Sequence, residues 1–372
     1  VECRARQRTL LIIDEALIYY LCQERGGRMF PLMQCTFPFT IADPYNTTSG
    51  LVPQEMFYGR DRERQLIWDP FGTNLVYGGR QLGKTALLRD VERRYNDPAS
   101  GILVKCVDLK AQGIGINRPI DDIWLVLSSN LSPEIGRHRH SSPDGLMRAV
   151  ENWLKEDDRR RILLLLDEAD AFLDSDSRTK GARDAQGYLH VARLKGLMDR
   201  TNRRFKVVFV GLHNVQRTAK DVNTPIAHLG SPVCIGPLLD NAEWREAMRL
   251  ISLPLETLGY RFATPDLPMR ILSYTNYYPS LIQLFCKYLL AYLTNPNRIH
   301  FDTRQCPPYV ITAKHIEDVY ASEELHREIA YRFNLTLDLD SRYRFIALRI
   351  ALESIGPGSE HALLHGEQHV DQ

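Results

Sequence analysis

The sequence predicts an α/β fold: a parallel five-stranded sheet between helices, followed by a helical domain. Three observations lead to this prediction. Five apolar stretches alternate with segments of helical spacing, which is typical of a parallel sheet covered on both faces. One of these stretches runs into a glycine-rich turn, GGRQLGKT, at residues 78–85. Beyond about Asn241 the strand-like stretches stop, and helical patterns follow.

The predicted strands are short runs of Val, Ile, Leu and Phe, bounded by turn residues. They are residues 73–78, 101–110, 161–170, 205–214 and 231–239. Between them, helical spacing predicts helices at residues 84–97, 119–130, 143–158 and 183–202. A short charged helix is expected within FYGRDRERQLIWDP, at residues 57–70, where it stops at Pro70.

The patterns along the chain divide it into six regions. Residues 1–43 have the pattern strand, helix, strand, and residues 44–56 form a linker rich in Pro, Gly, Thr and Asn. The α/β core is expected at residues 57–240. A helical lid domain follows at 241–300, a winged-helix-like region at 301–354 and a flexible tail at 355–372.

The composition is that of an ordinary soluble protein: 372 residues, 44% hydrophobic and 25% charged, with a net charge of +1. This charge does not favour nucleic acid or membrane as a partner. Seven cysteines without a CxxC pair indicate a reducing compartment. No apolar run approaches the roughly 20 residues that span a bilayer, and the first residues do not resemble a signal peptide. We therefore expect a cytoplasmic protein without a membrane partner.

The glycine-rich turn fits the pattern G-x-x-x-x-G-K-[ST] of a phosphate cradle. Glycines let successive backbone N–H groups face the phosphates, and the following helix presents its N-terminus to the anion. Lys84 would place its charge between the β- and γ-phosphates, and the Thr85 hydroxyl would ligate Mg²⁺. The predicted cradle consists of Gly78, Gly79, Arg80, Gln81, Leu82, Gly83, Lys84, Thr85 and Ala86.

An apolar strand, ILLLLDEAD, ends in two carboxylates that suit this cradle. Asp167 can hold Mg²⁺ through water, and Glu168 can orient and deprotonate an attacking water. Asp167 follows Lys84 by 83 residues, a spacing from which we expect the two strands to be adjacent. Without the cradle, the same pattern would fit a core strand followed by an acidic helix N-terminus.

A third strand, VVFVGLHN, also ends in polar residues. His213 or Asn214 could place a side chain between the attacking water and the γ-phosphate. Asn214 is the preferred catalytic candidate, His213 stays open, and a simple turn is the structural alternative.

Together these motifs resemble the P-loop ATPases with an added catalytic glutamate, and more narrowly the STAND branch near AAA+ ATPases. In that family a hydrophobic–hydrophobic–Gly–Arg element packs by the base, and residues 57–60, FYGR, match it. The family's Gly-x-Pro element aligns with Pro279, although Tyr277 stands where Gly is usual. The resemblance covers roughly residues 56–300 and implies that Tyr58, Arg60 and Pro279 also contact nucleotide.

The resemblance implies a switch that binds and hydrolyses ATP, with ATP/ADP and Mg²⁺ as cofactors. ADP would hold the helical regions closed on the core, and ATP would release them and allow a homo-oligomer to form. Bacterial members of such families serve signalling or phage defence. The arginine finger stays open among Arg137, Arg139, Arg217 and Arg245.

The alternative is a DNA-associated AAA+ ATPase, similar to origin-recognition or transposition regulators. It would touch DNA phosphates through the winged helix and the basic runs at 137–140, 157–162 and 200–205, although the net charge does not indicate DNA. A scaffold that holds nucleotide without hydrolysis, and a small-molecule kinase, are less favoured. The intact set of Lys84, Thr85, Asp167 and Glu168 argues for hydrolysis.

A second acidic pair, Asp14 and Glu15, follows an apolar stretch near the start of the sequence. A strand of this kind serves a cradle upstream of it, and only nine residues precede Leu10. Two interpretations stay open: residues 1–43 are the end of another P-loop domain in a longer protein, or a structural β-α-β extension. In both, Asp14 and Glu15 are acids at a helix N-terminus.

Overall fold

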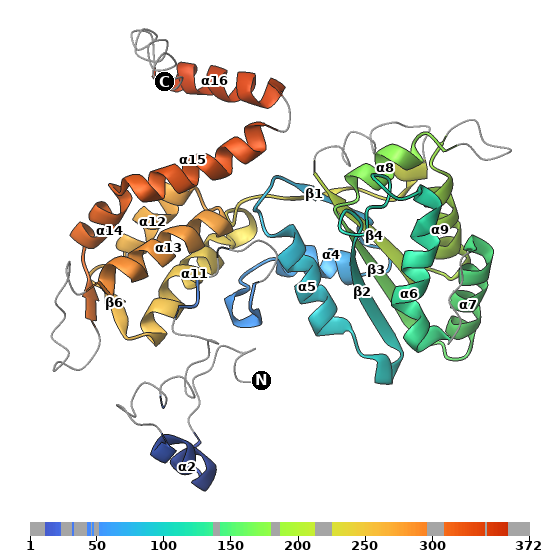
Figure 1. Ribbon diagram of the computed structural model, residues 1–372, viewed down its shortest axis with the longest axis horizontal. Helices are drawn as coiled ribbons and strands as arrows, with labels where there is room; N and C mark the ends of the chain where they lie inside the picture. Colours follow the sequence, from blue (N-terminus) through green and yellow to red (C-terminus); the bar gives the residue numbers. More distant parts are fainter. Residues whose placement is uncertain are drawn as a thin grey trace. The chain divides into compact units, whose positions relative to one another are not determined.

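The computed structural model describes residues 12–23, 32, 43–45, 47, 52–136, 142–179, 187–212, 225–295, 309–338 and 341–355. The chain divides into two compact units, Val1–Ile316 and Glu317–Gln372, and each is considered by itself. Figure 1 shows their helices and strands.

The first unit contains the predicted five-stranded sheet. Its strands are β1 (Leu75–Gly78), β2 (Ile102–Asp108), β3 (Arg161–Asp167), β4 (Phe205–Gly211) and β5 (Val233–Ile235). They lie in the order β2-β3-β4-β1-β5, and every neighbouring pair is parallel. The predicted α/β class and the five parallel strands are therefore confirmed.

One prediction about this sheet is wrong: the cradle strand and the acidic strand are not neighbours. Phe209 of β4 pairs with Leu75 of β1 on one side and with Leu166 of β3 on the other. After β1 the chain crosses to β2 at the edge of the sheet, and β4, which comes later in the sequence, lies between β3 and β1. The carboxyl ends of β1 and β3 still share one edge of the sheet, about two strand spacings or roughly 10 Å apart.

Helices cover both faces of the sheet, because the strands are apolar on both (Figure 1). One face carries α4 (Asp61–Trp68) and α5 (Lys84–Tyr95). The other carries α6 (Ile123–Ile135), α7 (Pro143–Lys155), α8 (Asp170–Asp176) and α9 (Leu189–Arg200). Each face has its own core: Val76 packs with α5, whereas its neighbour Leu75 packs with the second group. The four helices predicted between the strands are confirmed, with ends that differ by a few residues.

A helical region follows the sheet within the same unit. It contains α11 (Trp244–Thr257), α12 (Leu267–Thr275) and α13 (Pro279–Leu293). It also contains two short strands, β6 (Tyr260–Phe262) and β7 (Tyr309–Ile311), which pair in parallel. The prediction that strands stop near Asn241 is therefore wrong. Strands of three residues are too short to show a period that sequence reading can detect.

Tyr45 lies in the region predicted as a linker, but its side chain is buried. It is 1% exposed, and its hydroxyl donates a hydrogen bond to the carbonyl of Ile251 in α11 at 2.9 Å. The predicted linker thus contributes a core side chain to the helical region.

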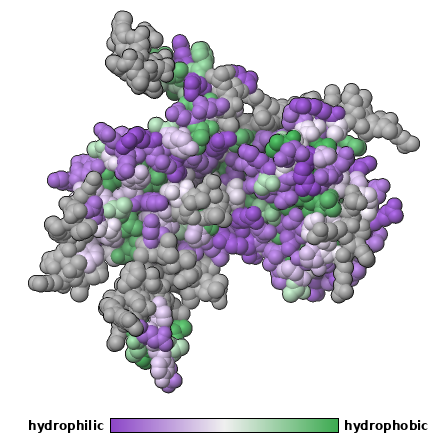
Figure 2. Space-filling view, in the orientation of Figure 1, coloured by the Kyte–Doolittle hydropathy of each residue, from purple (hydrophilic) through white to green (hydrophobic). Residues whose placement is uncertain are grey.

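Four further helices are described. They are α2 (Glu15–Gln23), α14 (Ala313–Tyr320), and, in the second unit, α15 (Glu323–Leu337) and α16 (Ser341–Ile355). Figure 2 shows hydrophobic surface at α2 and α16. The exposed apolar and aromatic side chains of these two helices include Ile18, Tyr19, Phe345 and Ile350. Of the two strands predicted for residues 1–43, the described residues include only Ile12 and Ile13 of the first, which are not in a strand, and Leu32 of the second, which is helical. The rest of both predicted strands lies outside the described residues, and the winged-helix-like region stays a prediction. None of the helices in the described part of the chain is both long and apolar enough to cross a membrane.

Single turns of 3₁₀-helix complete the description of the first unit. They are Gln54–Met56, Pro98–Ser100, Ile120–Asp122, Pro225–His228 and Asp240–Ala242.

Candidate active site at the carboxyl edge of the sheet

The glycine-rich turn lies between β1 and α5, where the sequence predicts the cradle. A Cβ atom at Gly78 would lie 2.5 Å from the carbonyl oxygen of Ile235, so only glycine fits beside β5. Gly83 has a φ of +87° and Gln81 a φ of 61°, so the loop makes two left-handed turns. No side chain caps the N-terminus of α5. Its first backbone N–H groups are therefore available to an anion.

Lys84 is held in the centre of this loop. It is 8% exposed, and its Nζ donates hydrogen bonds to the carbonyls of Gly78 and Gly79 at 2.9 and 2.7 Å. An ammonium has three donors, so one remains for a phosphate oxygen. Burial lowers the pKa of Lys84, while the nearby carboxylates, Glu168 first, raise it. The role of Lys84 against β- and γ-phosphates stays a prediction.

The structure brings Thr85 and Asp167 into direct contact. The Thr85 hydroxyl donates a hydrogen bond of 2.6 Å to Oδ2 of Asp167, which is 2% exposed at the end of β3. Burial raises the pKa of Asp167, whereas this hydrogen bond lowers it. A hydroxyl and a carboxylate side by side supply the oxygen ligands that Mg²⁺ prefers beside water and phosphate. These two residues fit the ion that the sequence predicts.

Glu168 adopts an unusual backbone conformation next to this pair. Its φ is 49°, in the left-handed region, and its backbone N–H donates to Oδ1 of Asp167 at 2.9 Å. Such strain in a residue other than glycine costs about 1–3 kcal/mol and is concentrated at functional sites. The residue is half-buried, so water can reach it.

Asp170, which sequence reasoning missed, connects the acidic strand to β4. Its Oδ2 accepts a hydrogen bond of 2.9 Å from the backbone N–H of Leu212, one residue beyond the end of β4. Its Oδ1 is buried and has no hydrogen-bond partner. Burial raises the pKa of Asp170. The sequence did contain a signal for this residue: Asp170 is a third acidic residue in the same motif, three positions after Asp167, where α8 begins. Asn214 and His213 themselves lie outside the described residues.

Two of the residues implied only by the family resemblance, Tyr58 and Arg60, are buried, and Arg60 contacts the cradle. Tyr58 is 6% exposed, and the guanidinium of Arg249 lies 5.8 Å from its ring centroid. Arg60 is 4% exposed and contacts the carbonyl of Leu82 in the cradle, at 3.5 Å. Nucleotide contact by Tyr58 and Arg60 stays a prediction.

Pro279 begins α13. The residues before it differ from the family element in amino-acid type, but their backbone conformation is similar to the one that the element's glycine suggests. Tyr277, where the family has Gly, has a φ of 59°, a conformation that Gly favours. Tyr278 packs against the core cluster that includes Leu82 of the cradle. Nucleotide contact by Pro279 also stays a prediction.

Among the four candidates for an arginine finger, Arg245 alone falls within the described residues. Its guanidinium lies 5.4 Å from the ring centroid of Trp244 in α11. Arg137, Arg139 and Arg217 lie outside the described residues, so the question stays open.

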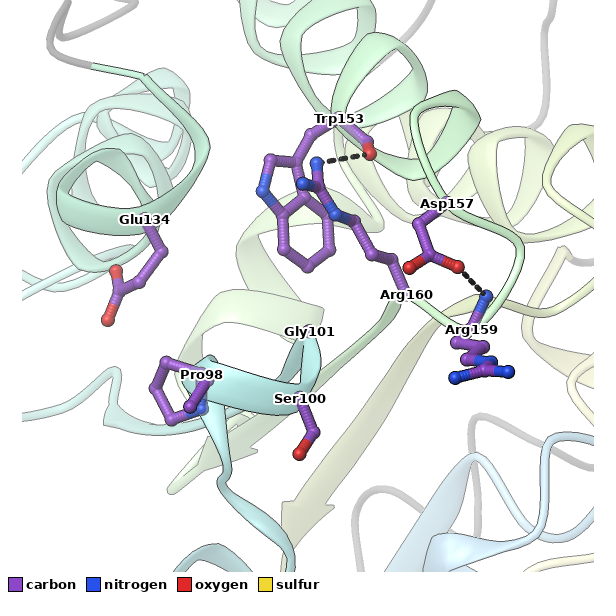
Figure 3. Close-up of a pocket in the computed structure, with 9 residues that line it drawn as sticks. Pro98, Ser100, Gly101, Glu134, Trp153, Asp157, Arg159 and Arg160 are labelled. Atoms are coloured by element: carbon purple, nitrogen blue, oxygen red, sulfur yellow. Dashed lines mark hydrogen bonds between the residues drawn. The ribbon is translucent and has the colours of Figure 1, made fainter.

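A cavity of about 510 Å³ lies at the other edge of the sheet, before β2 and β3. Figure 3 shows Arg160 stacked on Trp153, with its Nη1 donating to the Trp153 carbonyl at 3.0 Å. Asp157 likewise accepts from the backbone N–H of Arg159 at 2.8 Å. Ligands of open parallel sheets bind at the carboxyl ends of the strands, so this cavity is not a second candidate for the cradle's ligand.

The strand order, the cradle after β1 and the carboxylate after β3 define the fold of a P-loop NTPase. No protein-family model matches the sequence, and no curated protein matches it.

Among solved structures, the chain is similar to a Walker-type ATPase, PABY2304, of Pyrococcus abyssi, at 15% identity and a TM-score of 0.47. That match covers 65% of this chain and 70% of the other. It is also similar to PCH-2 of C. elegans, at 12% identity and a TM-score of 0.33, over 74% and 72% of the two chains. A likeness at this level carries no argument about function. The functional proposal therefore rests on the site itself.

Proposed function

We propose that this chain binds ATP with Mg²⁺ at the cradle and hydrolyses it. The observation that carries the proposal is the 2.6 Å hydrogen bond between Thr85 and Asp167. It joins the start of α5 to the end of β3, which are 82 residues apart, at the point where Lys84 is buried. A phosphate-binding loop, a buried cation and a carboxylate that meet at one edge of a sheet suit phosphoryl transfer.

Each residue has a distinct part in the proposed reaction. The first N–H groups of α5 and the free donor of Lys84 bind and orient the phosphates. Thr85 and Asp167 hold Mg²⁺, which neutralises charge on the β- and γ-phosphates when it is bound. Glu168 orients the attacking water and accepts its proton. Asn214 is the proposed further contact to that water, and Asp170 fixes the end of its strand through Leu212.

We further propose that hydrolysis serves a molecular switch of the STAND type. The family resemblance supports this proposal, together with the helical region that follows β5 in the same unit. In this scheme ADP keeps the helical region closed, and ATP allows a homo-oligomer to form. Signalling or phage defence by a cytoplasmic protein is the cellular role that the resemblance suggests.

The basic run at 200–205 does not favour the alternative role at DNA. In the basic run at 200–205, the arginines are bonded within the fold. Arg200 pairs with Glu151 at 2.8 Å, Arg203 with Asp199 at 3.1 Å, and Arg204 donates to the carbonyl of Leu154 at 2.6 Å. These guanidinium groups would have to leave internal partners to reach phosphates.

The test is phosphate release by the purified chain with ATP and Mg²⁺, for wild type, Lys84→Ala and Glu168→Gln. Lys155→Ala, an exposed lysine of α7, is the matched control. We expect Glu168→Gln to lose about 10²–10⁴-fold in rate while it still binds ATP, because it removes only the proton acceptor. Lys84→Ala should lose binding as well. Equal turnover in all four proteins would refute the assigned site.

A further inference from the structure

Arg60 joins four segments that are far apart in the sequence. Its guanidinium donates to the carbonyl of Leu82 in the cradle and to the carbonyl of Gly236 just after β5. Its Nη1 lies 3.0 Å from Oε2 of Glu243, the residue before α11, and its backbone N–H donates to Oε1 of Glu243 at 2.6 Å. Arg60 itself precedes α4. Most of its donors are thus committed to protein acceptors.

The pair of Arg60 and Glu243 is shielded from water. Their side chains are 5% and 12% exposed, so solvent screens the interaction little. Burial raises the pKa of Glu243, and the charge of Arg60 lowers it. A buried pair with two hydrogen bonds holds its geometry far more firmly than a surface ion pair.

The chain around Arg60 is shaped to allow this contact. Gly59 has a φ of +74°, and a Cβ atom there would lie 3.2 Å from Oε1 of Glu243. Both the backbone conformation and the approach of Glu243 therefore favour glycine at this position. Tyr45 and Tyr58 also contact α11, through Ile251 and Arg249. The segment before the sheet is thus anchored along the first helix of the helical region.

We propose that Arg60 is a positioning residue that couples the phosphate cradle to α11 through Glu243. The inference rests on the proposed nucleotide site. Leu82 precedes Gly83, the left-handed residue at the start of α5, so a nucleotide that orients the cradle's N–H groups also sets the position of the Leu82 carbonyl. Arg60 links that carbonyl to Glu243, and the linkage is reciprocal: a shift of α11 alters the affinity of the cradle.

The test combines Arg60→Lys, Glu243→Gln and the double variant with ADP and Mg²⁺ as the probe. A lysine cannot reach two carbonyls and a carboxylate as the planar guanidinium does. Glutamine keeps an acceptor for the Arg60 backbone N–H but removes the charge. Arg62→Gln is the matched control, because Arg62 lies two residues further on, in α4, and its guanidinium donates an exposed hydrogen bond of 3.3 Å to Asn241 instead of a buried one.

Two quantities are measured: the dissociation constant for ADP, and the hydrogen-exchange protection of α11 with and without ADP. We expect ADP to change the protection of α11 in wild type and in Arg62→Gln. In Arg60→Lys and Glu243→Gln that response should be lost, and ADP affinity should fall by about 5- to 150-fold, the usual range of coupling between sites. The double variant should lose no more than the worse single variant, since both act on one linkage.

The wild type alone can overturn the inference, even if a variant fails to fold. A chain that binds ADP while α11 shows no change in protection refutes the coupling and leaves the proposed function intact. The inference is also refuted if the losses of ADP affinity in the two single variants add up in the double variant. It is refuted as well if the variants bind ADP and α11 changes its protection as in wild type. A wild type that binds neither ADP nor ATP overturns the proposed function and the coupling together.

Discussion

Replacing Gly78 by alanine should destabilise the sheet where β1 meets β5. Gly78 is opposite Ile235 in the parallel pairing, and an added Cβ would lie 2.5 Å from the Ile235 carbonyl oxygen and 3.2 Å from its Cβ. Real Cβ contacts stay above 3.0 Å, so the strands would separate by about 0.5 Å or more. Overpacking of this kind costs about 1–3 kcal/mol.

Gly79→Ala is the matched control one residue further on. Its added Cβ would meet the end of the Leu82 side chain at 3.3 Å, and that side chain can move. We expect its effect on the free energy of unfolding to stay within about 0.5 kcal/mol of zero, as for most substitutions without a named cause.

The assay is urea unfolding of wild type and both variants, monitored by circular dichroism. The urea midpoints are compared, provided that the slope m of the unfolding free energy against urea is the same for all three proteins. Gly78→Ala should unfold at clearly lower urea than Gly79→Ala. Equal midpoints for the two variants would refute the account of why glycine stands at the end of β1.

Three other predictions concern single side chains. Thr85→Val should raise the Mg²⁺ concentration needed for ATP binding, because a hydroxyl ligand is lost, whereas Thr257→Val in α11 should not; an unchanged Mg²⁺ titration would contradict the metal assignment. Asp170→Ala should cost about 1 kcal/mol in urea unfolding, because the part-buried N–H of Leu212 loses its acceptor, and Asp170→Asn should cost less. Burial lowers the pKa of Lys206 to about 7, below its usual 10.5, so above pH 7 the unfolded chain binds more protons at this site. The free energy of unfolding of wild type relative to Lys206→Met should therefore rise between pH 7 and 9, by up to about 1.4 kcal/mol per pH unit, and a flat difference would contradict it.

Local patterns were enough to predict the candidate site, because its residues lie in two short contiguous segments. The cradle at 78–85 and the acidic pair at 167–168 each combine an apolar strand with the residue types that phosphate or Mg²⁺ requires. Parallel strands place their carboxyl ends at one edge, so the contact of Thr85 with Asp167 could be expected without knowledge of the strand order.

The strand order itself could not be predicted. Both β3 and β4 are mostly apolar strands with buried residues on both faces, so composition does not say which of them pairs with β1. The pairing depends on which way each connecting segment leads the chain across the sheet, and no short sequence pattern indicates this. The two-stranded sheet of β6 and β7 was missed for a different reason: its strands have three residues each and pair across 49 positions of sequence.

The contact of Arg60 with Glu243 was also beyond sequence reading. The two residues are 183 positions apart, and Glu243 does not stand out among the 46 acidic residues of the chain. The family resemblance suggested a nucleotide contact for Arg60, whereas the described contacts are with protein carbonyls and a carboxylate. The left-handed backbone of Tyr277 is a similar case, because its side chain gives no hint of a conformation that glycine prefers.

The most direct test of the nucleotide site is equilibrium binding of ATP to the purified chain in the presence of Mg²⁺. The account predicts saturable binding of one ATP per chain that weakens when Mg²⁺ is removed and is lost in Lys84→Ala, with Lys155→Ala unchanged. Absence of binding by the wild type, or equal binding by Lys84→Ala, would contradict it.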